Sequence, residues 1–303
     1  MLLGYRRNRV PMLPNTLYII GNGFDRAHGM ETSYGDFYVW LVSNGRLEII
    51  QELQDVFNAT DKGKYLLWSD FETALGQFDV HKVSDWGWEN ICVTEVYEVG
   101  EDGMPKDKLD SLLTYLNFEL DDIVNDTFSD WVRSVKVAEH RTKDLPQDAL
   151  YLTFNYTDTL EQLYQIPETN VCHIHGRASK GEKLIVGHNH PVNPSDFWKE
   201  DGYMRDNNER MQRFTTINNL VKPYQKIIES NESFFSSLSD VNVIHVIGHS
   251  CNEIDYPYFK KMKDSVSTVA KWVFESYKGE INEQLEKLVR ELRIMEYSII
   301  QTR

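Results

Sequence analysis

The sequence has few cysteines, no excess of basic residues and no long apolar run, and each absence narrows the function. Its three cysteines, Cys92, Cys172 and Cys251, lie far apart, so neither a disulfide framework nor a four-cysteine zinc site is expected. The net charge of −15 argues against general nucleic-acid binding, which needs a basic surface. No stretch approaches the roughly 20 apolar residues of a membrane span, and no apolar segment follows the arginines near the N-terminus. We therefore expect a soluble, cytoplasmic protein with no membrane contact.

What the sequence does contain is typical of a folded α/β protein. Its 303 residues, 41% of them hydrophobic, are enough for a substantial core. Short apolar runs alternate with segments of helical spacing, which predicts a Rossmann-like, mostly parallel sheet with helices on both faces. We expect a lead-in at 1–15 and a single domain at 16–303, with a mainly helical insertion at about 46–148. The predicted strands are 17–20, 150–154, 171–174, 184–186, 241–247, 271–274 and 295–300.

Several helices can be located from their caps and apolar spacing. Thr32 or Ser33 is the expected N-cap of a helix that carries Asp36 in its first turn. Residues 46–58 have helical spacing, and a charged helix is expected at 279–293. The insertion would either cover one face of the sheet or form a wall or lid over a site. Plain packing is the simpler of these two interpretations.

The chain is organised around the first predicted strand and the turn that follows it. Four apolar residues end at Gly21-Asn22-Gly23, and Phe24-Asp25 opens a helix-compatible segment. Glycines at such a point let a phosphate approach the backbone closely, and the next helix presents free N–H groups. Arg26, however, stands where the third glycine of a dinucleotide fingerprint would fall. On its own, this turn is as consistent with an ordinary β-turn as with a nucleotide site.

Polar residues follow five of the predicted strands. In an open parallel sheet, ligands bind beyond the carboxyl ends of the strands, so these residues should meet in one cleft. A fold without a site would scatter such residue types over both edges. The five segments are Gly21–Asp25, Asn155–Asp158, His175–Gly176, Gly187–His190 and Gly248–Asp255.

These and other short motifs, in this order, resemble the bacteriophage abortive infection family AbiH. The resemblance extends from about residue 17 to residue 300 and implies a prokaryotic antiviral defence protein. It is carried by Gly21-Asn-Gly-Phe-Asp25, Thr32-Ser-Tyr-Gly-Asp-Phe37, Trp68-Ser-Asp-Phe-Glu72, Phe154-Asn-Tyr-Thr-Asp158, His173-Ile-His-Gly176, Ile185-Val-Gly-His-Asn189 and Gly248-His-Ser-Cys-Asn-Glu-Ile-Asp255.

The strand ends are also similar, more distantly, to those of sirtuin-like NAD-binding domains. By that similarity Gly21 and Gly23 would face the pyrophosphate of NAD, and Asn155 would hold a water or a ribose hydroxyl. His175 would be the catalytic base, and Ser250 would contact the adenosine ribose. We also expect Asn22, Phe24, Asp25, His28, Gly248 and Asp255, which lie in or near these strand ends, to bind the NAD.

The chain departs from the sirtuin pattern in two ways. The aspartate of the Thr-x-Asn-x-Asp strand end falls on Thr157, and Asp158 comes one residue late. The zinc ribbon of deacetylating sirtuins has no four-cysteine counterpart. The resemblance therefore implies simple NAD hydrolysis, which passes through an oxocarbenium-like state and needs a base and a stabilising carboxylate. Asp158 is the expected catalytic carboxylate, although Asp25 or Asp255 could supply the charge instead.

Two other classes of function stay open. The same cleft could serve a nucleotide-binding sensor that lacks turnover. A metal-dependent hydrolase or nuclease could use the histidines instead, but no metal is expected, because a strand-end histidine more often makes hydrogen bonds. Expected partners are a small nucleotide, a phage-derived trigger and a second copy of the chain. The histidines in question are His173, His175, His188, His190 and His249.

Overall fold

The first strand, β1 (Thr16–Ile20), is buried from both sides and forms the centre of the sheet. In the computed structural model, which describes residues 15–56, 71–75, 126–191, 218, 220–276 and 279–301, β1 pairs in parallel with β2 (Leu150–Thr153) and with β4 (Val243–Ile247). Leu17, Ile19 and Ile20 are fully buried, which is why this strand is a continuous apolar run and not an alternating one. The core of the sheet is thus built around the stretch that precedes the glycine turn.

All six strands of the sheet are parallel, in the order β3-β2-β1-β4-β5-β6. This is the strand order of a doubly wound Rossmann sheet, and it reverses between β1 and β4. The predicted fold class is confirmed. The remaining strands are β3 (Val171–His173), β5 (Lys271–Ser276) and β6 (Tyr297–Gln301).

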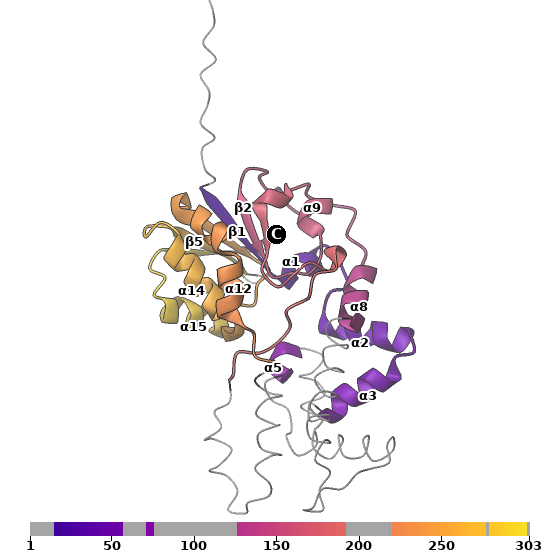
Figure 1. Cartoon of the computed structure of the whole chain (residues 1–303). Coiled ribbons are helices and arrows are strands. Elements are labelled where there is room, and N and C mark those ends of the chain that lie inside the picture. Colours follow the sequence, from indigo (N-terminus) through magenta and orange to yellow (C-terminus); the bar gives the residue numbers. More distant parts are fainter. Residues whose placement is uncertain are drawn as a thin grey trace, which may run out of the picture.

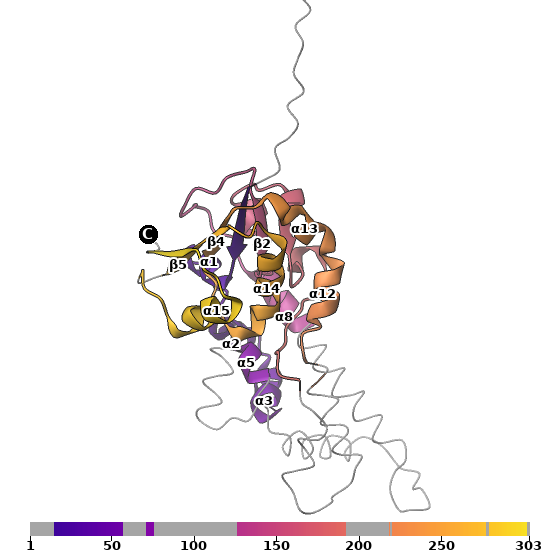
Figure 2. The ribbon, with the colours of Figure 1, turned by 90° about the vertical axis from the view of Figure 1, so that its left-hand side faces the viewer.

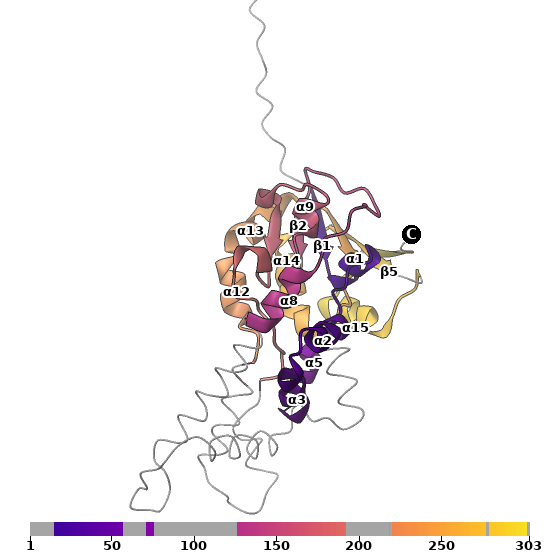
Figure 3. The same cartoon turned by 90° about the vertical axis from the view of Figure 1, so that its right-hand side faces the viewer.

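Helices cover the sheet from both sides (Figure 1). On one face of the sheet, a group of helices packs against Leu17, Ile244 and Trp272 (Figure 2). On the other face, α1 and α9 lie near Ile20 and Tyr151 (Figure 3). The first group is α12 (Tyr224–Ser230), α13 (Glu232–Ser236), α14 (Tyr256–Ser265) and α15 (Glu283–Leu292), and the second is α1 (Asn22–Ala27) and α9 (Thr159–Gln162). Short 3-10 turns occupy Glu168–Asn170, Ala178–Lys180, Ser237–Asp240 and Glu253–Asp255.

A second helical cluster extends from the carboxyl side of the sheet (Figure 1). Phe37 of α2 packs there against Phe71, Phe128 and Trp131 from the later helices. Ser33 caps α2 in a reciprocal capping box with Asp36, so of the two predicted caps Ser33 is the one used. Of the described parts of the predicted insertion, Leu47–Val56, Phe71–Leu75 and Phe128–Ser134 are helical and 135–148 is irregular, and the rest of it lies outside the described residues. The helices are α2 (Tyr34–Ser43), α3 (Leu47–Val56), α5 (Phe71–Leu75) and α8 (Phe128–Ser134).

One predicted strand, 184–186, is wrong. This segment runs beside the end of β3 without joining the sheet, and Ile185 N–H donates a single bond to the carbonyl of His175. Leu184 is buried in the helical cluster, whereas Ile185 packs against the main core. Its apolar character therefore reflects two different packing neighbours and not a ladder of strand hydrogen bonds.

Candidate functional site

A large cleft opens at the carboxyl ends of β1 and β4, the point where the strand order reverses. Its volume is about 1310 Å³, above the roughly 300–1,000 Å³ of typical small-molecule pockets. Phe128, Trp131 and Val132 of α8 form an apolar wall, so this helix both packs against α2 and lines the cleft. Ten of the twelve predicted site residues line it: Gly21, Asn22, Gly23, Phe24, Asp25, Asn155, His175, Gly248, Ser250 and Asp255.

The floor of the cleft is a seam of three glycines, Gly21, Gly23 and Gly248. Gly248 has a φ of +66°, and a Cβ on it would lie 2.1 Å from the backbone nitrogen of Phe24. Gly21 N–H donates to the carbonyl of Ile247 at 3.0 Å, and Gly23 N–H donates to that of Gly248 at 2.7 Å. The glycines are therefore needed for the close approach of two backbones. Because these two N–H groups are already bonded, a phosphate at this turn would need other donors.

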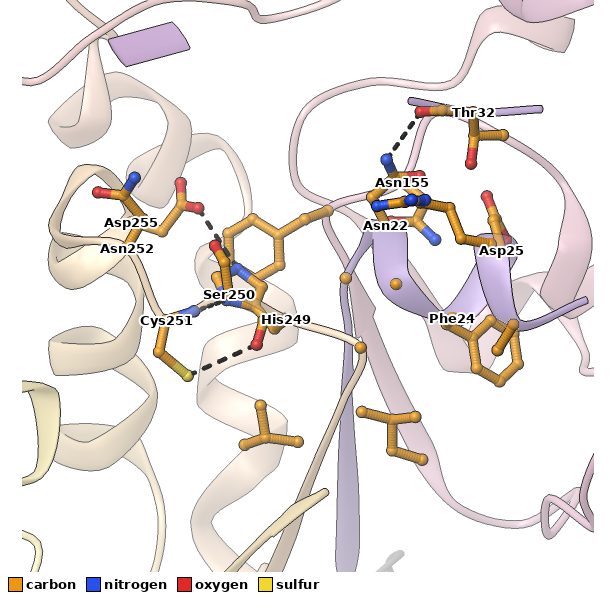
Figure 4. Close-up of a pocket in the computed structure, with 18 of the residues that line it drawn as sticks. Asn22, Phe24, Asp25, Thr32, Asn155, His249, Ser250, Cys251, Asn252 and Asp255 are labelled. Atoms are coloured by element: carbon orange, nitrogen blue, oxygen red, sulfur yellow. Dashed lines mark hydrogen bonds and ion pairs between the residues drawn. The ribbon is translucent and has the colours of Figure 1, made fainter. Parts of the chain in front are cut away.

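Asp25 and Asn155 form a buried polar corner on one side of the seam (Figure 4). The Thr157 hydroxyl donates to Oδ2 of Asp25 at 2.5 Å. Oδ1 of Asp25 and Oδ1 of Asn155 are both buried without a partner. Burial raises the pKa of Asp25 above its ordinary value, although the hydrogen bonds oppose this shift. Two unpaired acceptors in a cleft are suited to a ligand that brings hydrogen-bond donors.

His175 lies in the same cleft, enclosed by aromatic rings. The ring centres of Phe154 and Tyr258 are each 5.3 Å from that of His175. Its Nε2 has no hydrogen-bond partner and lies 3.9 Å from the Asp255 carboxylate. Burial, aided by the nearby charge of Lys222, holds the pKa of His175 well below its ordinary value. The imidazole is therefore neutral at pH 7.

A buried chain of charges lies behind His175. Lys222 is fully buried, and its Nζ is 2.7 Å from Glu72 and 3.2 Å from Asp255. Burial alone would raise the pKa of Asp255, but Lys222 and His249 outweigh it and hold that pKa well below its usual range. Glu72 belongs to one of the sequence motifs, but it does not follow a strand. Lys222 carries no recognisable signal, and sequence reasoning missed it.

His249 also lines the cleft, but both of its ring nitrogens are in use. Nδ1 accepts the backbone N–H of Cys251 at 2.9 Å, so the neutral ring carries its proton on Nε2. That nitrogen lies 3.3 Å from Oδ2 of Asp255 and donates to it. His249 thus fixes the loop after β4, whereas His175 keeps a nitrogen free.

The motifs that line this cleft belong to a known family. The family model described as bacteriophage abortive infection AbiH matches residues 17–276 of the chain. The chain belongs to the AbiH family. The protein therefore has a role in bacteriophage abortive infection. A search of curated proteins gave no match.

Two predicted site residues of this AbiH protein lie outside the cleft. His28 accepts or donates at both ring nitrogens, with the carbonyl of Phe24 and the hydroxyl of Tyr164 each at 2.7 Å. Asp158 forms an ion pair with Nε of Arg177. Burial opposes ionisation of Asp158, but hydrogen bonds from Ser179 and Arg177 lower its pKa overall. Both side chains make their contacts within the fold and outside the cleft.

The histidines of this AbiH chain do not gather at one point. His173 is bonded to Glu161 at 2.8 Å, away from His175 in the cleft, and the 187–190 segment does not line the cleft. Asp158, Glu161 and His173 have ligand atoms within 4.8 Å of one another, a spacing that suits a metal ion. The guanidinium of Arg177 already pairs with Asp158 there, and it lies 3.8 Å from Glu161. This cluster is therefore an ion-pair network in the described structure.

Within the part of the AbiH chain that the structure describes, no helix has the length and apolarity needed to cross a membrane.

Proposed function

We propose that the protein binds NAD or a related nucleotide in this cleft and hydrolyses the bond between nicotinamide and ribose. The observation that carries the proposal is a set of unpaired, buried polar atoms at the reversal of the strand order, where dinucleotides bind in Rossmann sheets. These atoms are Nε2 of His175 and a side-chain oxygen each of Asn155 and Asp25. The AbiH family membership supports a defence role.

The cleft offers suitable groups for each part of the substrate. The apolar wall of α8 and the ring of Phe154 suit a base or the nicotinamide ring. Arg26 is exposed at the rim, where it can pair with a pyrophosphate. Arg26 stands where the third glycine of a dinucleotide fingerprint would fall. Its positive charge can therefore bind a phosphate beside a glycine turn in which the N–H groups of Gly21 and Gly23 are already bonded.

His175 suits the role of general base. A neutral imidazole accepts the proton of an attacking water, and Asn155 orients that water or a ribose hydroxyl through its free Oδ1. The bond from ribose to the nicotinamide nitrogen breaks with its electron pair passing to that nitrogen, which loses its formal charge. The water oxygen then bonds to the anomeric carbon, giving ADP-ribose, free nicotinamide and a proton.

Purified protein incubated with NAD, with nicotinamide release measured, tests this proposal. We expect His175→Ala and Asn155→Ala each to lower the rate at least 100-fold. His140→Ala, an exposed histidine outside the cleft, is the control and should keep the wild-type rate. NAD binding with no nicotinamide release would favour the sensor. Activity removed by a chelator and restored by a divalent metal would favour the metal-dependent hydrolase.

A further inference from the structure

Among the carboxylates in and near the cleft, Asp25 differs from the others because it is buried and no described cation pairs with it. Asp255 is paired with Lys222 and His249, and Asp158 is paired with Arg177 outside the cleft. The other lining carboxylates are either paired or exposed: Glu72 with Lys222, Glu275 with Lys143, and Glu280 at the surface. Asp25 makes no ion pair with any described residue, although its side chain is fully buried. Its charge is therefore not neutralised by a neighbour.

Asp25 is instead held by a neutral donor. The Thr157 hydroxyl donates to Oδ2 of the carboxylate, and His28 contributes only a distant attraction. This hydrogen bond fixes the orientation of Oδ2 and leaves Oδ1 buried and unpaired in the cleft. Thr157 occupies the position where the strand-end pattern has an aspartate, so the carboxylate at this corner comes from α1, directly after β1.

We infer that Asp25 is the catalytic carboxylate of the proposed NAD hydrolysis, and that it contacts the nicotinamide ribose. This inference rests on the proposed function. As the glycosidic bond breaks, positive charge develops on the ribose ring, and Asp25 in its ionised form stabilises that charge, because no described cation beside the carboxylate offsets it. Oδ1 accepts a hydrogen bond from a ribose hydroxyl, and such bonds strengthen in the transition state. Asp25 itself forms no covalent bond, and the proton of the water goes to His175.

The test compares wild type with Asp25→Asn, an isosteric change that removes the charge. NAD binding by calorimetry and the kinetics of nicotinamide release are measured on both. We expect kcat to fall at least 100-fold, while the Kd for NAD stays within about threefold. The control is Asp130→Asn, which removes an exposed carboxylate of α8 outside the cleft and should keep kcat within twofold. If Asp25→Asn keeps more than a third of the wild-type kcat, the inference is overturned.

A second variant keeps the inference testable if Asp25→Asn does not fold. Thr157→Val keeps the carboxylate but removes the hydroxyl that holds Oδ2, and we expect at least a fivefold fall in kcat at unchanged Kd. An unchanged kcat in this variant also overturns the inference. Failure of the proposed function is seen separately, in the wild type alone, as the absence of NAD binding or of nicotinamide release. Either wild-type result overturns the catalytic role of Asp25 as well.

Discussion

Replacing Lys222 with methionine tests whether this lysine neutralises both Glu72 and Asp255 in the buried charge chain behind His175. Methionine has a similar length and no charge, so the change leaves Glu72 and Asp255 without their shared cation. Removing one partner from a buried ion pair costs about 3–5 kcal/mol, because the remaining charge stays desolvated. With contacts of 2.7 and 3.2 Å to two carboxylates, we expect Lys222→Met to lie at the upper end of that range.

The loss of stability should depend on pH. In the wild type, the folded pKa of Asp255 is lower than its unfolded value of about 3.9. Its contribution to stability is therefore present above that value and is lost as the pH falls through the folded pKa. In Lys222→Met, burial without the cation raises the folded pKa above the unfolded value, so the penalty is full at pH 7 and is relieved on acidification. The gap between the two proteins should narrow from pH 7 to pH 4.5.

Urea unfolding followed by tryptophan fluorescence at both pH values measures this gap. Lys260→Met is the matched control, because Lys260 pairs with Asp264 on the surface of α14, and its loss should cost at most about 0.5 kcal/mol. Lys222→Met combined with Asp255→Asn should recover part of the lost stability. A loss below about 1 kcal/mol, or one that is the same at both pH values, would refute the balance of charges described here.

Two further predictions concern the glycine seam and the cysteines. Gly248→Ala should lower the free energy of unfolding, measured in urea, by at least about 3 kcal/mol, because a Cβ there meets the backbone of Phe24. Gly45→Ala is the control, because Gly45 has a similar φ of +71° but lies in open space, and this change should cost only about 1–2 kcal/mol. Similar losses at the two sites would contradict the close packing. Burial raises the pKa of the Cys172 and Cys251 thiols to about 12, so neither should react with a thiol reagent at pH 8 until urea unfolds the chain, and rapid labelling of the native protein, located by mass spectrometry, would refute their burial.

Much of the fold was predictable because both faces of the sheet are covered. Strands such as Thr16–Ile20 and Val243–Ile247 then become mainly apolar runs that end at glycine, and such ends are visible in the sequence. The same signal failed at 184–186, where three apolar residues serve two separate clusters. A run of three residues cannot distinguish a strand from a packed loop.

The position of the candidate site could be predicted from the sequence, but which of its charged side chains form ion pairs could not. The strand ends indicated which loops meet, and Asn155 and His175 do line one cleft. They could not indicate that Arg177, two residues beyond His175, neutralises Asp158, or that His28 is bonded at both nitrogens. Nor could they show that a lysine from the segment before α12 reaches Asp255. Ion pairs between distant segments depend on side-chain directions, which the order of the motifs does not encode.

The glycine seam has a consequence for how the cleft can change. Its hydrogen bonds join backbone atoms, so only a substitution of the glycines themselves is expected to change the spacing between the start of α1 and the loop after β4. The two halves of the cleft are thereby held at a fixed separation, with Asp25 and Asn155 on one half and His249 and Asp255 on the other. Substitutions on either half can then alter which ligand is accepted without moving the groups on the opposite half.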